Sequence, residues 1–259
     1  MAPQIITVTN QKGGVGKTSL AVHIAAYAAM AARKKTLLVD MDGQRNATFI
    51  TTGEPHTPEG GPSIIELWDE DAEPGFLDTR FGNLKILPGH QHANLVEKQG
   101  LRTGQAAMSR LLKMDFDVVV IDTPPAAGVL QQAPLYLGGL LAAPVEPDLL
   151  ALQGLTSLLK VWREISSQVD LGLSLVINKR VLNSTNQQMV VDAITKSGFG
   201  QHVLPVHLTN RQLVSNALKQ GMPVWKLDPK DAAAAKWAMA CKMILDMDRV
   251  PTEDTGKEG

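Results

Sequence analysis

The sequence predicts an α/β protein with a doubly wound, mostly parallel β-sheet flanked by helices. Short apolar runs rich in β-branched residues recur along the 259 residues, and stretches with helical periodicity separate them. A glycine-rich loop also stands between the first apolar run and the first helical stretch, which is the order typical of a phosphate-binding loop. We expect one domain over residues 1–250, followed by a polar tail over 251–259.

Composition limits the kinds of function that the chain can have. Lys and Arg total 25, Asp and Glu total 26, and the net charge is −1, so any contact with nucleic acid must come from a local basic patch. The single cysteine, Cys241, excludes a disulfide framework and a cysteine-rich metal site. We find no signal peptide and no apolar run that could span a bilayer, and therefore expect a cytoplasmic protein.

The glycine-rich loop covers residues 11–19 and follows a strand expected at 5–9. Its glycines let backbone N–H groups approach a phosphate, and the helix expected at 20–33 adds the positive end of its dipole. Lys17 is placed to reach the β- and γ-phosphates, and the Thr18 hydroxyl is placed to bind Mg²⁺. The predicted nucleotide-binding residues of the loop are Lys12, Gly13, Gly14, Val15, Gly16, Lys17, Thr18 and Ser19.

The loop departs from the standard pattern G-x-x-x-x-G-K-[ST], because Gln11 occupies the first glycine position and Lys12 adds a second lysine. A dinucleotide-binding fingerprint is a weaker alternative, since Ser19 replaces its third glycine and it gives the Lys17-Thr18 pair no role. The sequence Lys-Gly-Gly-Val-Gly-Lys-Thr resembles the deviant Walker A box of the ParA/MinD ATPases. The resemblance implies a P-loop NTPase fold, ATP and Mg²⁺ as cofactors, and a catalytic Lys12 that reaches the partner subunit's phosphates in an ATP-bound sandwich dimer.

Paired acidic residues follow the second expected strand, at 36–40. Alternation along an extended chain puts Asp40 and Asp42 on one side, where two carboxylates suit Mg²⁺ and a nucleophilic water. The stretch resembles the family segment Asp-x-Asp-Pro-Gln-x-Asn, which implies that Asp42 positions the attacking water and that Asp40 lies beside the metal. Gly43 replaces the usual proline and Arg45 a frequent glycine, and both bear on the rate of hydrolysis.

A third acid, Asp122, ends a strand expected at 117–122 and precedes Thr-Pro-Pro. It resembles a Walker B acid, which holds Mg²⁺ directly or through water. Thr18, Asp40 and Asp122 are therefore the predicted metal-site residues, and Lys12, Lys17 and Asp42 the predicted catalytic residues.

The middle of the chain supplies further elements of the expected sheet. Residues 53–83 indicate a surface connection with a short helix at 63–68, followed by a strand near 84–87, and we interpret His90 and His92 as surface residues. We expect helices at 105–114 and 149–169, and strands at 140–145 and 173–178. Asn178 ends the last of these strands, where it is either a turn residue or, as the resemblance implies, the residue that binds adenine.

The last third of the chain predicts a helix at 187–198, a final strand at 203–208 and a helix at 232–247. Residues 210–224 resemble a family segment near which ParA proteins contact DNA. The candidate DNA contacts are Arg211, Lys219, Lys226 and Lys230, each of which is equally explained as a solvated surface residue. The acidic tail differs from the basic amphipathic end of MinD-type proteins.

The resemblance implies a partition ATPase of the short ParA type. Its ATP-bound homodimer would bind DNA non-specifically on the nucleoid, and a ParB-like partner on a plasmid or chromosome would trigger release. Two alternatives remain open. One is a ParA-like ATPase that positions a non-DNA cargo, such as an organelle or a protein cluster, and the other is a MinD-like regulator recruited to a membrane.

Overall fold

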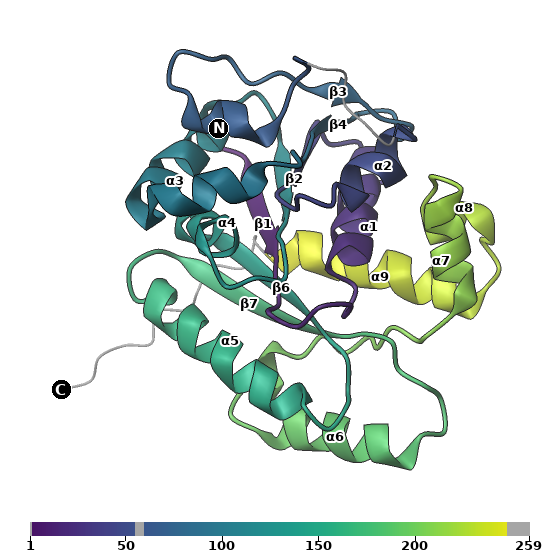
Figure 1. The fold of residues 1–259 in the computed structure, drawn as a ribbon. Helices are drawn as coiled ribbons and strands as arrows, with labels where there is room; N and C mark the ends of the chain where they lie inside the picture. The colour runs from purple at the N-terminus through teal and green to yellow at the C-terminus, as the bar shows by residue number, and fades with distance from the viewer. Residues whose placement is uncertain (1, 55–59, 248–259) are drawn as a thin grey trace.

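A computed structural model describes residues 2–54 and 60–247, which form a seven-stranded sheet in the order β3-β4-β2-β5-β1-β6-β7 (Figure 1). Neighbouring strands are parallel except β3, which runs antiparallel to β4 at one edge. The predicted doubly wound, mostly parallel sheet is thus confirmed. The strands are β1 Gln4–Val8, β2 Thr36–Asp40, β3 Leu77–Asp78, β4 Leu84–Leu87, β5 Val118–Asp122, β6 Gly139–Val145 and β7 Leu171–Ile177.

Helices cover both faces of the sheet (Figure 1). One face carries α1, α2, α7, α8 and α9, and the other carries α3 and α4 over the β2 side and α5 and α6 over β6 and β7. The helices are α1 Lys17–Met30, α2 Asn46–Thr52, α3 Leu101–Ser109, α4 Val129–Gln132, α5 Ala151–Ser166, α6 Thr185–Lys196, α7 Gln212–Lys219, α8 Val224–Leu227 and α9 Ala232–Met247. Short 3₁₀ turns are η1 Ile64–Trp68, η2 Ala93–Gln99, η3 Arg110–Lys113, η4 Ala133–Leu137 and η5 Gly200–His202.

The central strands are apolar throughout because side chains on both of their faces are buried. In β1, Ile6 and Val8 pack against α1 and α9, whereas Ile5 packs on the opposite face with α3. Burying one such side chain contributes about 1.5–3 kcal/mol to folding. The continuous apolar runs, rather than alternating ones, therefore reflect a sheet with two covered faces.

The prediction of a strand at 203–208 is wrong. Isolated bridges at Leu175 with Val203 and at Arg180 with Thr209 connect the chain here to β7 and the residues after it. The backbone N–H groups of Leu204 and Leu208 also donate to β7, but no continuous strand forms. Pro205 lies between the bridges and has no N–H to donate, which explains why a continuous ladder does not form. The chain here follows the sheet edge and then leads into α7.

Two other expectations concern local structure. The short helix predicted at 63–68 forms as the 3₁₀ turn η1, which begins with a capping box between Ser63 and Glu66.

The predicted tail at 251–259 lies outside the described residues. No helix within the described residues is long and apolar enough to cross a membrane.

A buried histidine joins the first helix to the C-terminal part of the chain. His23 on α1 is fully buried, its Nδ1 lies 2.6 Å from the Ser19 carbonyl oxygen, and the backbone N–H of Val224 donates to its Nε2 at 3.1 Å. These contacts require a neutral ring with the proton on Nδ1. Trp237 and Trp225 pack against the ring, with centroids 4.4 and 5.5 Å away. Burial lowers the pKa of His23 to about 4.

We expect His23→Ala to lower the free energy of unfolding by about 2–4 kcal/mol. The change removes a buried ring and leaves the Val224 N–H without its acceptor. Urea denaturation followed by circular dichroism measures the loss. Met239→Ala, at a half-exposed site on α9, is the matched control and should change stability by less than about 0.5 kcal/mol.

The parent protein and His23→Ala can also be compared as the pH is lowered. Because the folded pKa of His23 lies below the unfolded value of 6.5, the unfolded chain binds the extra proton between pH 6.5 and about 4. The parent therefore loses this part of its stability as the pH falls through that window, whereas His23→Ala does not. The stability difference between the two proteins should narrow toward pH 4, and a constant difference would contradict the buried neutral ring.

Candidate nucleotide-binding site

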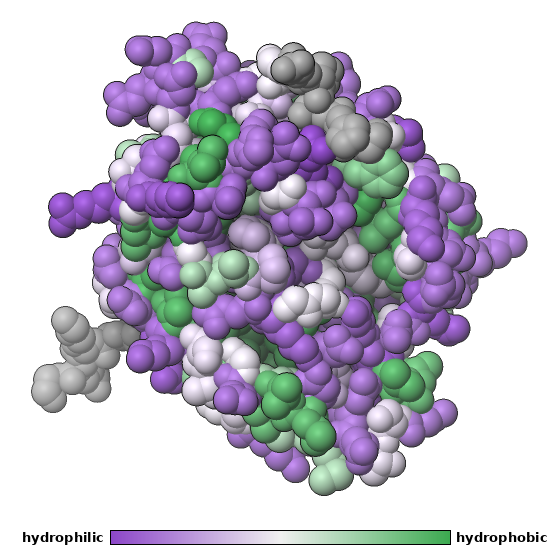
Figure 2. All heavy atoms as spheres, in the orientation of Figure 1, coloured by the Kyte–Doolittle hydropathy of each residue, from purple (hydrophilic) through white to green (hydrophobic). Residues whose placement is uncertain are grey.

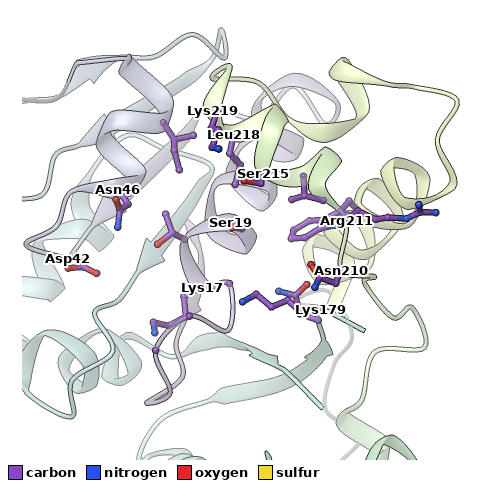
Figure 3. Close-up of a pocket in the computed structure, with 18 of the residues that line it drawn as sticks. Lys17, Ser19, Asp42, Asn46, Lys179, Asn210, Arg211, Ser215, Leu218 and Lys219 are labelled. Atoms are coloured by element: carbon purple, nitrogen blue, oxygen red, sulfur yellow. The ribbon is translucent and has the colours of Figure 1, made fainter. Parts of the chain in front are cut away.

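A cavity of about 580 Å³ lies at the carboxyl edge of the sheet, above the start of α1 (Figure 3). Its walls come from the glycine-rich loop, α2, the end of β7 and α7. Lys17, Asp42 and Asn178 all line it, although they come from three separate parts of the chain. The predicted nucleotide-binding residues that line the cavity are Gly13, Gly14, Gly16, Lys17, Thr18, Ser19 and Asn178.

The glycine-rich loop needs its glycines for two reasons. Gly14 and Gly16 have φ of +75° and +97°, in the left-handed region where other residues are strained. A side chain at Gly16 would also collide with the Asn178 amide. That amide nitrogen donates to the Val15 carbonyl at 2.8 Å, so Asn178 holds the loop against the end of β7. Its predicted contact with adenine stays a prediction.

Lys17 is a buried cation beside this loop. Its Nζ makes a long hydrogen bond of 3.3 Å to the Lys12 carbonyl, and burial lowers the pKa of its ammonium group. The negative charges of Asp122 and Asp42 act in the opposite direction. A cation that has lost much of its hydration in this way is well suited to bind the oxygens of a phosphate.

Asp40 organises the turn after β2. Its carboxylate accepts hydrogen bonds from the Thr48 backbone N–H at 2.8 Å, the Thr48 hydroxyl at 2.7 Å and the Asp42 N–H at 3.2 Å. Burial raises its pKa to about 6, against the effect of these bonds. The structure thus gives Asp40 a role in fixing Asp42 and the start of α2. Its predicted place beside the metal stays a prediction.

Asp122 is different, because its buried carboxyl group lacks the hydrogen bonds that Asp40 has. Both carboxylate oxygens are buried, and neither has a well-formed hydrogen-bond partner among residues 2–54 and 60–247. Burial and then repulsion from Asp40 raise its pKa well above the usual value, while the nearby Thr18 hydroxyl and Lys17 favour its charged form. A buried carboxyl group that has no hydrogen-bond partner and lies next to a hydroxyl fits a divalent cation.

The described residues do not supply a complete metal cage. No group of three or more His, Cys, Asp or Glu side chains is arranged to hold an ion in the part of the chain that the structure describes. His90 and His92 are neighbours but do not form such a group. Mg²⁺ commonly binds through one or two protein ligands together with substrate phosphates, and Asp122 with Thr18 provides a set of that size.

Lys12 lies at the start of the loop, between Asn10 and the chain that follows β6. Its backbone N–H donates to the Asn10 side chain at 2.9 Å, and the Asn10 amide donates to the Pro144 carbonyl at 2.9 Å. Its ammonium forms an ion pair with the Asp148 carboxylate. In this structure Lys12 is thus bound within its own chain.

The candidate DNA contacts fall into two groups. Arg211 and Lys219 line the nucleotide cavity at the two ends of α7, and Figure 3 shows both on that wall. Lys226 on α8 and Lys230 after it are exposed and do not line the cavity. All four stay predictions as DNA contacts, but only the second pair can be changed without altering the cavity.

Three contributors to the site were not predicted from the sequence. Lys179 lines the cavity beside Asn178, Asp148 binds Lys12, and Thr48 fixes Asp40. Position at the carboxyl end of β7 is the signal that could have pointed to Lys179, because polar residues there face the nucleotide edge of a doubly wound sheet. No local signal pairs Lys12 with Asp148, which is 136 residues away.

Comparison with known proteins identifies relatives. Residues 3–175 match the family described as an AAA domain. The chain is 30% identical to the sporulation initiation inhibitor protein Soj of Bacillus subtilis, over 93% of this chain and 98% of the relative. It is 27% identical to the chromosome-partitioning ATPase Soj of Treponema pallidum, over 94% and 97%. An ATP complex of a Cyanothece McdA variant has the same fold, with a TM-score of 0.83 at 19% identity over 96% of this chain and 99% of that chain.

We expect Lys17→Ala to abolish nucleotide binding, because the buried ammonium group is placed to neutralise phosphate charge. Titration with a fluorescent ATP analogue measures binding. Lys160→Ala, at an exposed position on α5, is the control for loss of a lysine as such and should bind like the parent. A Lys17→Ala protein that binds ATP normally would remove the phosphate-loop assignment.

Proposed function

Because the chain belongs to the ParA/MinD family of deviant Walker A ATPases, we propose that it hydrolyses ATP in the cavity above α1. The observation that carries the proposal is the pair of opposite buried charges beside the glycine-rich loop. Burial lowers the pKa of Lys17 and raises that of Asp122 despite the attraction between the two groups, and neither carboxylate oxygen of Asp122 has a hydrogen-bond partner among the described residues. A magnesium–triphosphate complex would bring further charge of the opposite sign to each group.

The residues of the cavity have different roles in the transfer of the γ-phosphoryl group to water. The loop glycines and the start of α1 present backbone N–H groups to the phosphates, and Lys17 neutralises the charge that develops on the γ-phosphate. Thr18 and Asp122 would hold Mg²⁺, which neutralises further phosphate charge when bound. Asp42 lines the cavity on a turn fixed by Asp40, and it orients the attacking water.

The proposed cycle includes a homodimer. Lys12 leaves its own chain and reaches the phosphates of the partner subunit, so the site is complete only when two ATP-bound copies meet. The ATP-bound dimer binds DNA non-specifically, and a ParB-like partner stimulates hydrolysis and release. This cycle would assign the protein to DNA partition, as the name of the Treponema relative, chromosome-partitioning ATPase Soj, indicates for that protein.

DNA binding in each nucleotide state tests the proposal. Fluorescence anisotropy on a random duplex should show binding with ATP and none with ADP, while size-exclusion chromatography shows dimers with ATP. ATP-dependent dimers without DNA binding would instead favour a regulator of non-DNA cargo. Sedimentation with liposomes containing anionic lipid tests the membrane-recruited alternative, which requires the protein to sediment with the liposomes when ATP is present.

Asp42→Ala should keep ATP binding but stop hydrolysis, which traps the ATP-bound dimer. The side chain that orients water is lost, whereas the loop and Lys17 are unchanged. Phosphate release and size-exclusion chromatography with ATP measure the two effects. If Asp40→Ala gives the trapped dimer and Asp42→Ala does not, the roles assigned to the two acids must be exchanged.

Replacing Lys226 and Lys230 with glutamate should weaken DNA binding and leave ATP binding unchanged, since both lie outside the cavity. Each phosphate contact that is lost should reduce the slope of log K against log salt by about 0.9 for duplex DNA. Arg211 and Lys219 are unsuitable for this test because they line the cavity. Lys160→Glu on α5 is the matched charge reversal. An unchanged affinity and slope would exclude Lys226 and Lys230 from the DNA footprint.

A further inference from the structure

A half-buried glutamate holds the short helix that follows Asp122. Glu97 lies on η2, and its two carboxylate oxygens accept hydrogen bonds from the backbone N–H groups of Val129 and Leu130 at 2.5 and 3.1 Å. These are the first two residues of α4, where backbone N–H groups have no partner within the helix. Hydrogen bonds to a carboxylate are charge-assisted and strong. Glu97 therefore fixes the start of α4 from a different segment of the chain.

The contact requires a glycine at position 128. A Cβ atom on Gly128 would collide with the Glu97 carboxylate. The backbone of Gly128 is extended, with φ of −153° and ψ of −169°, a conformation that other residues adopt readily. Space for the carboxylate is therefore the reason for a glycine here. Val96 of η2 and Leu130 of α4 also pack in one buried apolar cluster, which keeps the two elements side by side.

The residues between Asp122 and α4 have few contacts of their own. They are called the proline loop below, which covers residues 123–128. Positions 124–128 are two prolines, two alanines and a glycine, and none of these side chains can form a hydrogen bond. Figure 2 shows large apolar side chains gathered where α5 begins and beside α6, whereas the proline loop has only small ones. The position of the loop is therefore set by its two ends.

Both ends of the proline loop are anchored. At its start, the Thr123 hydroxyl donates to the Val8 carbonyl at 3.0 Å. At its other end, the side chain of Gln131 on α4 donates back to the Pro124 carbonyl in a long hydrogen bond of 3.4 Å. The next residue, Pro125, lines the nucleotide cavity. Because Glu97 holds α4, the position of this cavity wall depends on Glu97.

The segment that leads to this glutamate begins beside the other acids of the site. It covers residues 89–97 and is called the bridging segment below. The Gly89 N–H donates to the Thr48 hydroxyl at 3.1 Å, and that hydroxyl donates to the Asp40 carboxylate at 2.7 Å. A side chain at Gly89 would collide with the Asp42 carbonyl. The bridging segment therefore contacts the turn of Asp42 at one end and supports the proline loop from the other.

We infer that Glu97 is a positioning residue for ATP hydrolysis, which holds the proline loop at the cavity and couples its position to the turn that carries Asp42. The inference rests on the proposed hydrolysis. It gives the bridging segment a defined role, because the loop after the proposed magnesium ligand Asp122 and the turn of the water-orienting Asp42 then keep one relative placement. Such placement matters, since an error of about 1 Å in the position of reacting groups can lower a rate about 100-fold.

Removal of the carboxylate tests the inference. Glu97→Ala should lower kcat for phosphate release about 10- to 100-fold and leave the affinity for a fluorescent ATP analogue within about twofold of the parent, because the glycine-rich loop and Lys17 are unchanged. Glu97→Gln keeps one acceptor oxygen and should have an intermediate kcat. Lys98→Ala, at the next and exposed position of η2, is the matched control and should equal the parent.

Gly128→Ala tests the same contact from its other side. The added methyl group displaces the Glu97 carboxylate without straining the backbone, so kcat should fall as it does in Glu97→Ala. In the Glu97→Ala background, Gly128→Ala should have no further effect. Losses of kcat that simply multiply in the double variant would show that the two residues act separately, and would overturn the inference.

Hydrogen exchange measures the coupling independently of activity. In Glu97→Ala the backbone amides of 123–132 should exchange faster, because the start of α4 has lost its acceptor. The amides of 42–48 should also exchange faster, since the bridging segment contacts that turn through Gly89. Helix α5, at 151–166, is the internal control and should exchange as in the parent. Faster exchange confined to 123–132 would overturn the coupling that the inference requires.

These measurements distinguish the inference from the proposed function. A parent protein that hydrolyses no ATP would remove both. A parent that hydrolyses ATP at the same rate as Glu97→Ala would overturn the inference alone. Circular dichroism checks that each variant is folded, and Glu97→Gln and Gly128→Ala carry the test if Glu97→Ala does not fold.

Discussion

Uncompensated charge at the carboxyl edge of the sheet is the constraint on which the rest of the structure depends. Lys17, Asp40 and Asp122 are all buried there, and a buried charge is costly unless it is paired. Asp40 is satisfied by Thr48 and the Asp42 N–H, whereas the Asp122 carboxylate is not satisfied by the described residues. The surrounding apolar core fixes these groups in place. A bound anion and a bound cation would therefore complete the charge balance of the folded protein.

The sequence predicts the residues that line the cavity because those residues follow strands. A parallel sheet collects its strand ends at one edge, so the glycine-rich loop, Asp42 and Asp122 could be placed together from apolar runs alone. Asp40 illustrates the limit. Its position at the end of β2 was predicted correctly, but its hydrogen bonds to Thr48 depend on how α2 folds back, and no sequence pattern specifies that.

The features that the sequence did not predict are long-range contacts and the absence of a strand at 203–208. His23 meets the Val224 N–H across 201 residues, and Lys12 meets Asp148 across 136. Nothing in the local sequence of either partner selects the other. The first pairing depends on α8 lying beside α1, and the second on β1 and β6 lying side by side in the sheet. The segment at 203–208 has the composition of a strand, but Pro205 has no N–H to donate, and the segment makes isolated bridges in place of a continuous ladder.

Helix α7 connects the nucleotide cavity with the basic residues that are proposed to contact DNA. Arg211 at its start and Lys219 at its end line the cavity, and the chain after it is bonded to α1 through His23. Trp237 packs on that histidine and also lines the cavity. A ligand that fills the cavity therefore contacts the same packed group that positions α8. Lys226 on α8, although outside the cavity, belongs to an element that is bonded to α1 through His23. If Lys226 contacts DNA, it therefore does so from a helix whose position depends on the packing beside the nucleotide cavity.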